Sequence, residues 1–259
     1  MPNLFFRGVF CFGVGLLSAA PLQADLVIDG FSSPAGGQVA SDDTINGVPV
    51  ISSLGGQAGL LGMSREIIVN KTGQIGFGTQ TVRASSNEVD TDIFNFDQFS
   101  STARGTANLI YDGGADGMLS PMGLGGVDLT QGGTNAGFVF ENLTVTGSGL
   151  MLTVNLYNAA TGALFTSGAQ LLTNGFMGDY VLLYSSFVGP GGALTPTNVG
   201  AIEIIVDGSA IVASGSDLTF ALVSSAAVPE PSSMVLCGLL SLAGVGYRLR
   251  RRPVASAAA

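Results

Sequence analysis

The sequence lacks several residue types on which catalytic chemistry often depends. Among its 259 residues there is no His and no Trp, and Lys occurs once, as Lys71. Without His there is no Ser-His-Asp triad and no His-ligated metal centre. The two Cys residues, Cys11 and Cys237, both lie in apolar segments near the ends of the sequence. The segment between them therefore offers no disulfide, no thiol nucleophile and no Cys-ligated zinc.

Charge is scarce and unevenly distributed. Charged residues make up 10% of the sequence, against about a quarter in an average soluble domain. The segment 25–228 holds four basic residues against 17 acidic ones, a net charge of −13. A segment this acidic has no basic patch for a nucleic-acid backbone, so nucleic acid is excluded as a partner. With 39 Gly and many β-branched residues, the composition favours an extracellular all-β protein over a cytosolic enzyme.

Residues 1–24 have the features of a secretory signal peptide. Arg7 supplies a positive charge, 8–17 is an apolar run, and small residues follow it. We expect cleavage after Ala24, which makes Asp25 the first residue of the mature protein. The alternative is an N-terminal membrane helix, but the apolar run is shorter than the ~20 residues that a membrane span needs.

A second processing signal is expected near the C-terminus. Pro229, Glu230 and Pro231 cannot continue a helix or a central strand, so the backbone there is extended and accessible. The apolar run 234–247 follows and is predicted as a short transmembrane helix. A basic cluster comes next, made of Arg248, Arg250, Arg251 and Arg252. By the positive-inside rule this cluster stays in the cytoplasm, which places 25–228 outside the membrane.

These three elements, in this order and behind a signal peptide, resemble the sorting signal of PEP-CTERM proteins. The predicted signal is 229–252, with 253–259 as a tail beyond the arginines. In that family the tail is the substrate of exosortase, a transpeptidase-like membrane cysteine protease of Gram-negative bacteria. The resemblance implies use of the secretion machinery and an inner-membrane intermediate with a cytoplasmic C-terminus. Tail removal and delivery to the cell surface or a biofilm's exopolysaccharide matrix would follow. The alternative is an ordinary single-span anchor with a chance Pro-Glu-Pro.

Short pieces of 25–228 also resemble a recurrent type of PEP-CTERM ectodomain. They are 60–66, 126–133 and 198–203. This resemblance implies a β fold and exposure outside the cell, and it implies no particular reaction.

The segment 25–228 alternates apolar and polar residues over many short stretches, which predicts half-buried β-strands. The candidate strands are 25–29, 66–70, 76–84, 89–96, 106–111, 138–145, 152–157, 180–184, 201–206 and 217–222. Glycine-rich and Asn/Asp-rich pieces between them have the composition of turns. About ten strands without a helical period predict one antiparallel, jelly-roll-like β-sandwich domain, with 25–61 partly loop.

Asp112 and Asp116 are the candidate metal ligands, within Tyr-Asp-Gly-Gly-Ala-Asp-Gly. Two carboxylates with flexible glycines between them suit Ca²⁺, a hard cation that prefers oxygen ligands. The spacing differs from an EF-hand, and the alternative is a turn whose Asp side chains accept hydrogen bonds from nearby backbone N–H groups. No other cofactor is expected. Lys71, within Asn-Lys-Thr-Gly, is interpreted as a solvated turn residue.

Three functions remain open for the domain. The leading hypothesis is a structural protein of the cell surface or matrix that is not an enzyme. The alternative is a carbohydrate-binding module for extracellular polysaccharide, with Phe94, Phe96 and Phe99 as candidate stacking residues. Core packing is the competing interpretation of Phe94 and Phe96, because they share a strand face. The third hypothesis is a glycan hydrolase or lyase, which needs a cleft with two carboxylates about 5–9.5 Å apart.

Overall fold

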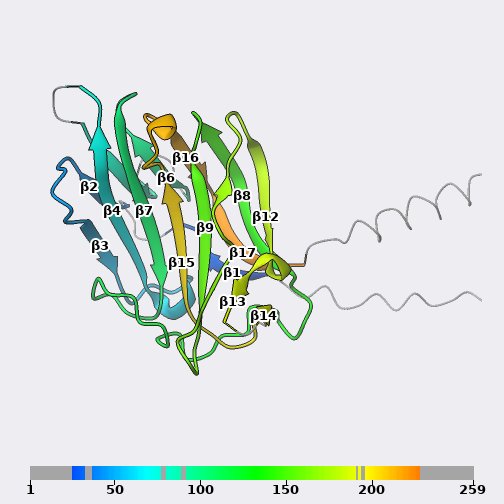
Figure 1. The fold of residues 1–259 in the computed structure, drawn as a ribbon. Coiled ribbons are helices and arrows are strands. Elements are labelled where there is room, and N and C mark those ends of the chain that lie inside the picture. Colours follow the sequence, from blue (N-terminus) through cyan, green and yellow to red (C-terminus); the bar gives the residue numbers. More distant parts are fainter. Residues whose placement is uncertain are drawn as a thin grey trace, which may run out of the picture.

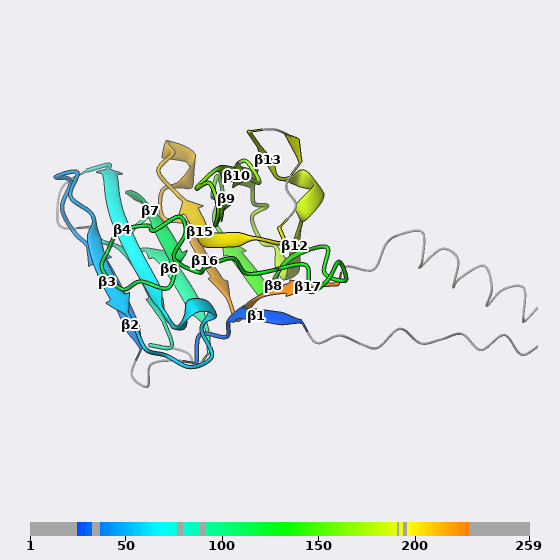
Figure 2. The ribbon, with the colours of Figure 1, turned by 90° about the horizontal axis from the view of Figure 1, so that it is seen from below.

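The alternation of apolar and polar residues is realised as two layers of β-strands. A computed structural model describes residues 25–32, 37–76, 80–88, 92–190, 192–193 and 196–227. Within these residues there are 17 strands and three short 3-10 turns, and the strands form two antiparallel sheets. The sheets face each other as a jelly-roll-like sandwich (Figures 1 and 2). The expected all-β fold is therefore confirmed.

The eight-stranded sheet has the order β1-β17-β8-β16-β6-β5-β2, and β12 also pairs with β8. Its strands are β1 (Leu26–Asp29), β2 (Gln38–Asp42), β5 (Val82–Ser86), β6 (Phe94–Gln98), β8 (Gly137–Thr146), β12 (Met177–Leu183), β16 (Asp217–Phe220) and β17 (Leu222–Ala226). The first and last strands of the described chain are neighbours in this sheet, because Leu26 pairs with Ser225.

The nine-stranded sheet has the order β14-β13-β10-β9-β15-β7-β4-β3, and β11 also pairs with β9. Its strands are β3 (Val50–Leu54), β4 (Arg65–Gln74), β7 (Ala103–Tyr111), β9 (Met151–Asn158), β10 (Leu164–Thr166), β11 (Gln170–Leu171), β13 (Val188–Gly189), β14 (Gly192–Ala193) and β15 (Val199–Asp207). The 3-10 turns are η1 (Leu61–Met63), η2 (Tyr184–Ser186) and η3 (Ile211–Ala213).

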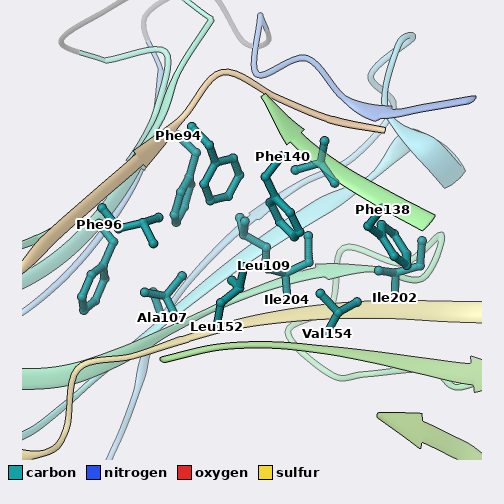
Figure 3. Close-up of a cluster of buried hydrophobic side chains, with 14 of the residues drawn as sticks. Phe94, Phe96, Ala107, Leu109, Phe138, Phe140, Leu152, Val154, Ile202 and Ile204 are labelled. Atoms are coloured by element: carbon teal, nitrogen blue, oxygen red, sulfur yellow. The ribbon is translucent and has the colours of Figure 1, made fainter. Parts of the chain in front are cut away.

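The inward side chains of the two sheets form one core (Figure 3). Phenylalanines from the eight-stranded sheet, such as Phe94 and Phe140, face aliphatic side chains of the other sheet, such as Leu152 and Ile204. All four are fully buried. Burial of one such side chain is worth about 1.5–3 kcal/mol. The described residues contain no Cys, so this core takes the stabilising role that disulfides have in many exported domains.

Lys71 is buried, so the interpretation of this residue as a solvated turn residue is wrong. It lies in β4, and 2% of its surface is exposed. Its Nζ donates hydrogen bonds to the backbone carbonyls of Asp43 (2.8 Å) and Gln80 (2.5 Å), and its backbone N–H donates to Oδ2 of Asp42 (2.8 Å). Strand β4 runs through Asn-Lys-Thr-Gly, so the alternation that points Val69 inward also points Lys71 inward.

The expected number of strands was too low. The long candidates 106–111, 138–145 and 152–157 correspond to β7, β8 and β9, each extended by one to three residues at its ends. The strands that were missed have two to five residues. The longer ones lack a strict alternation of apolar and polar residues, and the shortest are too short to display any pattern. The missed strands are β2, β3, β10, β11, β13, β14 and most of β17, because the candidate 217–222 reaches only the first residue of β17, Leu222. Three of the strands, β1 to β3, lie in the part that was expected to be partly loop.

Several predicted features lie outside the described residues. They are the signal peptide 1–24, the Pro-Glu-Pro segment, the apolar run 234–247 and the arginine cluster. In the part of the chain that the structure does describe, no helix is both long enough and apolar enough to cross a membrane.

Candidate functional site

The outer face of the nine-stranded sheet carries a polar cluster centred on Glu203. Glu203 lies in β15, and its neighbours come from the strands on both sides. Its Oε1 accepts a hydrogen bond from Nδ2 of Asn108 in β7 (2.8 Å). Its Oε2 accepts from Nδ2 of Asn155 (2.9 Å) and from the hydroxyl of Tyr157 (3.2 Å), both in β9. Three donors therefore hold one carboxylate in place on the sheet. We call these four residues the Glu203 cluster.

The Glu203 cluster is equipped for hydrogen bonding. Burial, and then the negative charge of Glu203, raise the pKa of Tyr157 to about 12. The phenol is therefore protonated at neutral pH and acts as a donor. Tyr157, Asn108 and Glu203 are partly exposed, so carboxylate, amide and phenol groups lie together on an accessible surface. Such a surface can bind the hydroxyl groups of a ligand without any covalent step.

Glu66 lies on the same face but is covered. Its Oε1 accepts hydrogen bonds from the backbone N–H of Gly117 (2.5 Å) and from the hydroxyl of Ser53 (3.1 Å). The residue is fully buried, and its Oε2 has no hydrogen-bond partner. Burial raises the pKa of Glu66, and the nearby charges of Asp112 and Asp116 raise it further, against the lowering effect of the two hydrogen bonds.

The structure places Glu66 and Glu203 two strands apart. Both pair with Ile110 in register, from opposite sides of β7, which separates their Cα atoms by about 10 Å. Ile110 lies between them and is almost fully buried. A substrate on this face would meet Glu203 but not Glu66, because the loop at Gly117 covers Glu66. The two glutamates do not form an open pair of catalytic carboxylates.

Asp97 and Asp217 are a second pair of carboxyl groups. Burial, a hydrogen bond between the two side chains and the charge of Asp217 raise the pKa of Asp97 to about 6, and Arg83 opposes this shift. Directly hydrogen-bonded carboxyl groups leave no room for the sugar ring and water of a glycosidase mechanism.

Asp112 and Asp116 occupy a turn close to Glu66, but the three carboxylates are not placed to share a metal ion. Asp112 accepts hydrogen bonds from the backbone N–H groups of Gly114 (2.9 Å) and Ser120 (2.6 Å), and Asp116 accepts one from Met118 (3.0 Å). Among the described residues, no group of three or more His, Cys, Asp or Glu side chains is placed to hold a metal ion. Calcium binding by these two residues stays a prediction.

The three candidate stacking residues differ in their exposure to solvent. Phe94 and Phe96 are fully buried in the core, which confirms core packing and removes them as stacking residues. Phe99 is 53% exposed, and the guanidinium of Arg83 lies 5.8 Å from the centre of its ring. Phe99 is therefore the one of the three that a ligand can reach.

The Glu203 cluster was missed at the level of the sequence. The alternation in 152–157 and 201–206 was used to find the inward aliphatic side chains, and the outward residues between them were not considered as a set. That pattern does place Asn155, Tyr157 and Glu203 on the outward face. The pairing of β15 with β7 and β9, which brings Asn108 beside them, depends on long-range contacts that the pattern does not contain.

Residues 227–252, of which the structure describes only 227, match the family model of the PEP-CTERM protein-sorting motif. The chain carries a PEP-CTERM sorting signal. The match includes Pro229, Glu230, Pro231 and the four arginines, so the resemblance seen in the sequence is confirmed. The motif indicates an exported protein that is processed at a C-terminal signal. It covers about a tenth of the chain and gives no activity for the sandwich.

Solved structures resemble the sandwich of this protein at low identity. The family 11 carbohydrate-binding module of cellulase Lic26A-Cel5E of Clostridium thermocellum has a TM-score of 0.37 and 9% identity, over 80% of this chain and 98% of the module. The agarase AgWH50C has a TM-score of 0.37 and 10% identity, over 59% of this chain and 23% of the agarase. At these values the likeness says nothing about what this protein binds. No curated protein has a sequence that matches the chain.

Proposed function

We propose that this protein is a non-enzymatic component of the cell surface or the exopolysaccharide matrix. It passes through the inner membrane with its C-terminus in the cytoplasm, and exosortase removes its tail. The observation that carries the proposal is the sorting motif at 227–252. A sandwich that has no His or Cys and few charges fits a structural protein better than an enzyme.

The positions of the carboxylates support the absence of catalysis. Glu66 is covered by a loop, and Asp29 is paired with Arg65 in the interior. Asp97 and Asp217 hydrogen-bond each other. None of these groups has the arrangement of an acid and a base on either side of an open substrate site.

An activity assay tests this proposal. Residues 25–227 contain every described strand and the whole described core, so this segment is expected to fold alone. Incubated with exopolysaccharide from its host, it should release no reducing ends and no unsaturated sugars. Turnover that persists in Glu141→Gln but disappears in Glu203→Gln would contradict the proposal and favour the hydrolase or lyase hypothesis.

A second candidate function is glycan binding through the Glu203 cluster. The specific observation is the set of hydrogen-bonding groups on an accessible sheet face around Glu203 and Tyr157. Calorimetry of residues 25–227 against polysaccharides of the host should then detect binding that Tyr157→Ala abolishes. Phe99→Ala is the matched control, since Phe99 is an exposed aromatic residue elsewhere. Binding lost only in Phe99→Ala would move the site away from the Glu203 cluster.

A further inference from the structure

The Glu203 cluster spans β7, β15 and β9, which lie side by side (Figure 1). A carboxylate only accepts hydrogen bonds. The amides of Asn108 and Asn155 must therefore turn N–H groups toward Glu203, and Tyr157 must donate its hydroxyl hydrogen. This leaves the two amide carbonyl oxygens and the phenol oxygen for other partners, with one further N–H on each amide. Toward a ligand, the cluster is mainly an acceptor of hydrogen bonds.

No basic side chain of the sandwich neutralises Glu203. The segment 25–228 has four basic residues, and the structure describes all of them: Arg65, Lys71, Arg83 and Arg104. Arg65 and Lys71 are buried, and Arg83 belongs to the other sheet. Arg104 lies in β7, six residues along that strand from the partner of Glu203, which separates the two by about 20 Å. Among the described residues, no ion pair includes Glu203.

The ionisable groups nearest to Glu203 on this sheet are acidic. Asp207 lies four residues further along the outward face of β15, at about 13 Å. Glu66 lies two strands away, with Asp112 and Asp116 close to it. An anionic group brought to the Glu203 cluster is therefore repelled, and a cationic group is attracted.

Apolar side chains lie beside the polar ones. Ile205 follows Glu203 on the outward face of β15 and is partly exposed. Leu164 pairs in register with Tyr157 and is 40% exposed. A sugar ring has apolar C–H groups as well as polar substituents, so it can contact both kinds of side chain, whereas a small inorganic cation would use only the carboxylate.

We propose that the ligand of the Glu203 cluster is an amino-sugar glycan with free, protonated amino groups. An ammonium group has three donors and no acceptor, which matches the acceptors that the cluster presents. Its charge compensates Glu203 through a charge-assisted hydrogen bond. N-acetylation of the sugar removes this charge, and a uronic acid reverses it. The inference rests on the second candidate function, because it names the ligand class of that same site.

Calorimetry with residues 25–227 tests the ligand class at weakly acidic pH and low salt. The probes are a glucosamine oligomer, the same oligomer after full N-acetylation, and a galacturonic acid oligomer. We expect the glucosamine oligomer to bind at least about tenfold more tightly than the acetylated one, because charge-assisted hydrogen bonds are stronger than neutral ones. Added salt should weaken its binding. If the acetylated or the uronic oligomer bound as tightly, the ligand class would be wrong, while glycan binding would stand. If no glycan bound, the second candidate function would fail as well.

Charge-matched variants separate the site from the overall acidity of the domain. Glu203→Gln should abolish the preference for the free amine. Glu141→Gln removes one charge from β8 in the other sheet and should change the affinity by less than about twofold, since salt screens distant charges. Circular dichroism checks that both variants fold, and the comparison of the three oligomers on the wild-type protein does not depend on them. Equal weakening by the two variants, or equal binding of a lysine oligomer of the same charge, would indicate diffuse attraction and overturn the proposal.

Discussion

Arg65 is the largest fully buried side chain of the sandwich, and its charge is balanced across the two sheets. Its Nη1 donates to Oδ2 of Asp29 (2.6 Å), its Nε to Oε1 of Gln38 (2.9 Å) and its Nη2 to the hydroxyl of Ser86 (2.5 Å). The hydroxyl of Tyr111 also donates to Oδ2 of Asp29 (2.7 Å). Arg65 and Tyr111 belong to the nine-stranded sheet and the other three to the eight-stranded sheet. The network therefore links the two layers.

Removing one partner of this ion pair should be more harmful than removing both. Arg65→Met leaves Asp29 charged and buried, so we expect a loss of about 3–5 kcal/mol in the free energy of unfolding. The double variant Asp29→Asn/Arg65→Met should lose less than Arg65→Met alone. Urea unfolding of residues 25–227 measures both. Arg83→Met, which breaks the partly exposed pair with Glu88, is the control and should cost at most about 1 kcal/mol.

Asp97 should make stability fall as pH rises through the weakly acidic range. Its pKa is raised to about 6 in the folded protein, by burial first and then by Asp217. Its contribution is therefore complete below its ordinary pKa of 3.8 and is lost as pH rises toward 6 and above. Asp97→Asn removes this dependence. At pH 7 the variant should be more stable than the wild type by about 1 kcal/mol, since solvent screening weakens an effect at a partly exposed site.

The opposite sign is expected at Asp128, which serves as the control. Hydrogen bonds from Thr130 lower the pKa of Asp128, so its contribution is present above pH 3.8 and is lost as pH falls below that value. Asp128→Asn should therefore destabilise the protein at pH 7. Thermal unfolding between pH 3 and 8 gives both curves. Parallel curves for wild type and Asp97→Asn would contradict the shift at Asp97.

The sequence predicted the apolar core residues better than the buried charges. Alternation within 66–70 identifies Ile67 and Val69 as one face, and the same period extends to Arg65 and Lys71. Buried Lys and Arg are rare, so the residue types alone predict that the side chains of Arg65 and Lys71 are exposed to solvent. Only the hydrogen-bonding partners of the two side chains make their burial possible. Asp29 is 36 residues away from Arg65, and no local pattern could have indicated it.

Among the elements, the connection between β7 and β8 can pack closely against β15 only because β15 has a glycine at the point of contact. Gly200 lies in β15, and a Cβ there would meet the backbone of Pro121, Met122 and Ala159. The backbone N–H of Leu124 also donates to Gly200 O (2.8 Å). The loop that covers Glu66 therefore belongs to a connection that is fixed where it crosses β15.

Gly200→Ala should loosen this connection. The added methyl group meets two backbone segments that cannot rotate away, so we expect a loss of about 1–3 kcal/mol in the free energy of unfolding. Hydrogen exchange should rise first at 117–124. Gly30→Ala is the matched control, because a Cβ there has nothing within 4 Å, and it should be neutral or slightly stabilising. Equal effects of the two substitutions would contradict the close approach at Gly200.

The long central strands could be predicted, whereas the short edge strands could not. Strands β7, β8, β9 and β15 have eight to ten residues each, enough for several alternations between the core and the outer face. Strands β10, β11, β13 and β14 have two or three. They are strands only because β9 and its neighbours offer backbone groups for hydrogen bonding. The residues of these short strands do not themselves indicate that pairing.

At the scale of the whole molecule, the described sandwich leaves its C-terminal strand next to its first strand. Leu26 pairs with Ser225, so the sandwich is closed two residues before the matched sorting signal begins at 227. Removal of the tail would therefore cost the sandwich no strand and no member of its described core. The fold and the processing signal are separate units, and a change in one should not affect the other.

Replacing Pro229, Glu230 and Pro231 together by Ala should block processing without affecting the fold. In the native host, the wild-type protein should lose both ends in its intact mass, while the variant keeps its tail and stays in the inner membrane. Alanine removes the extended Pro-Glu-Pro backbone that the protease must hold. Pro253→Ala, just beyond the matched residues 227–252, is the control and should be processed normally. If wild type and variant both kept the tail, Pro-Glu-Pro would be incidental, and the protein would be a sandwich held at the membrane by a simple anchor.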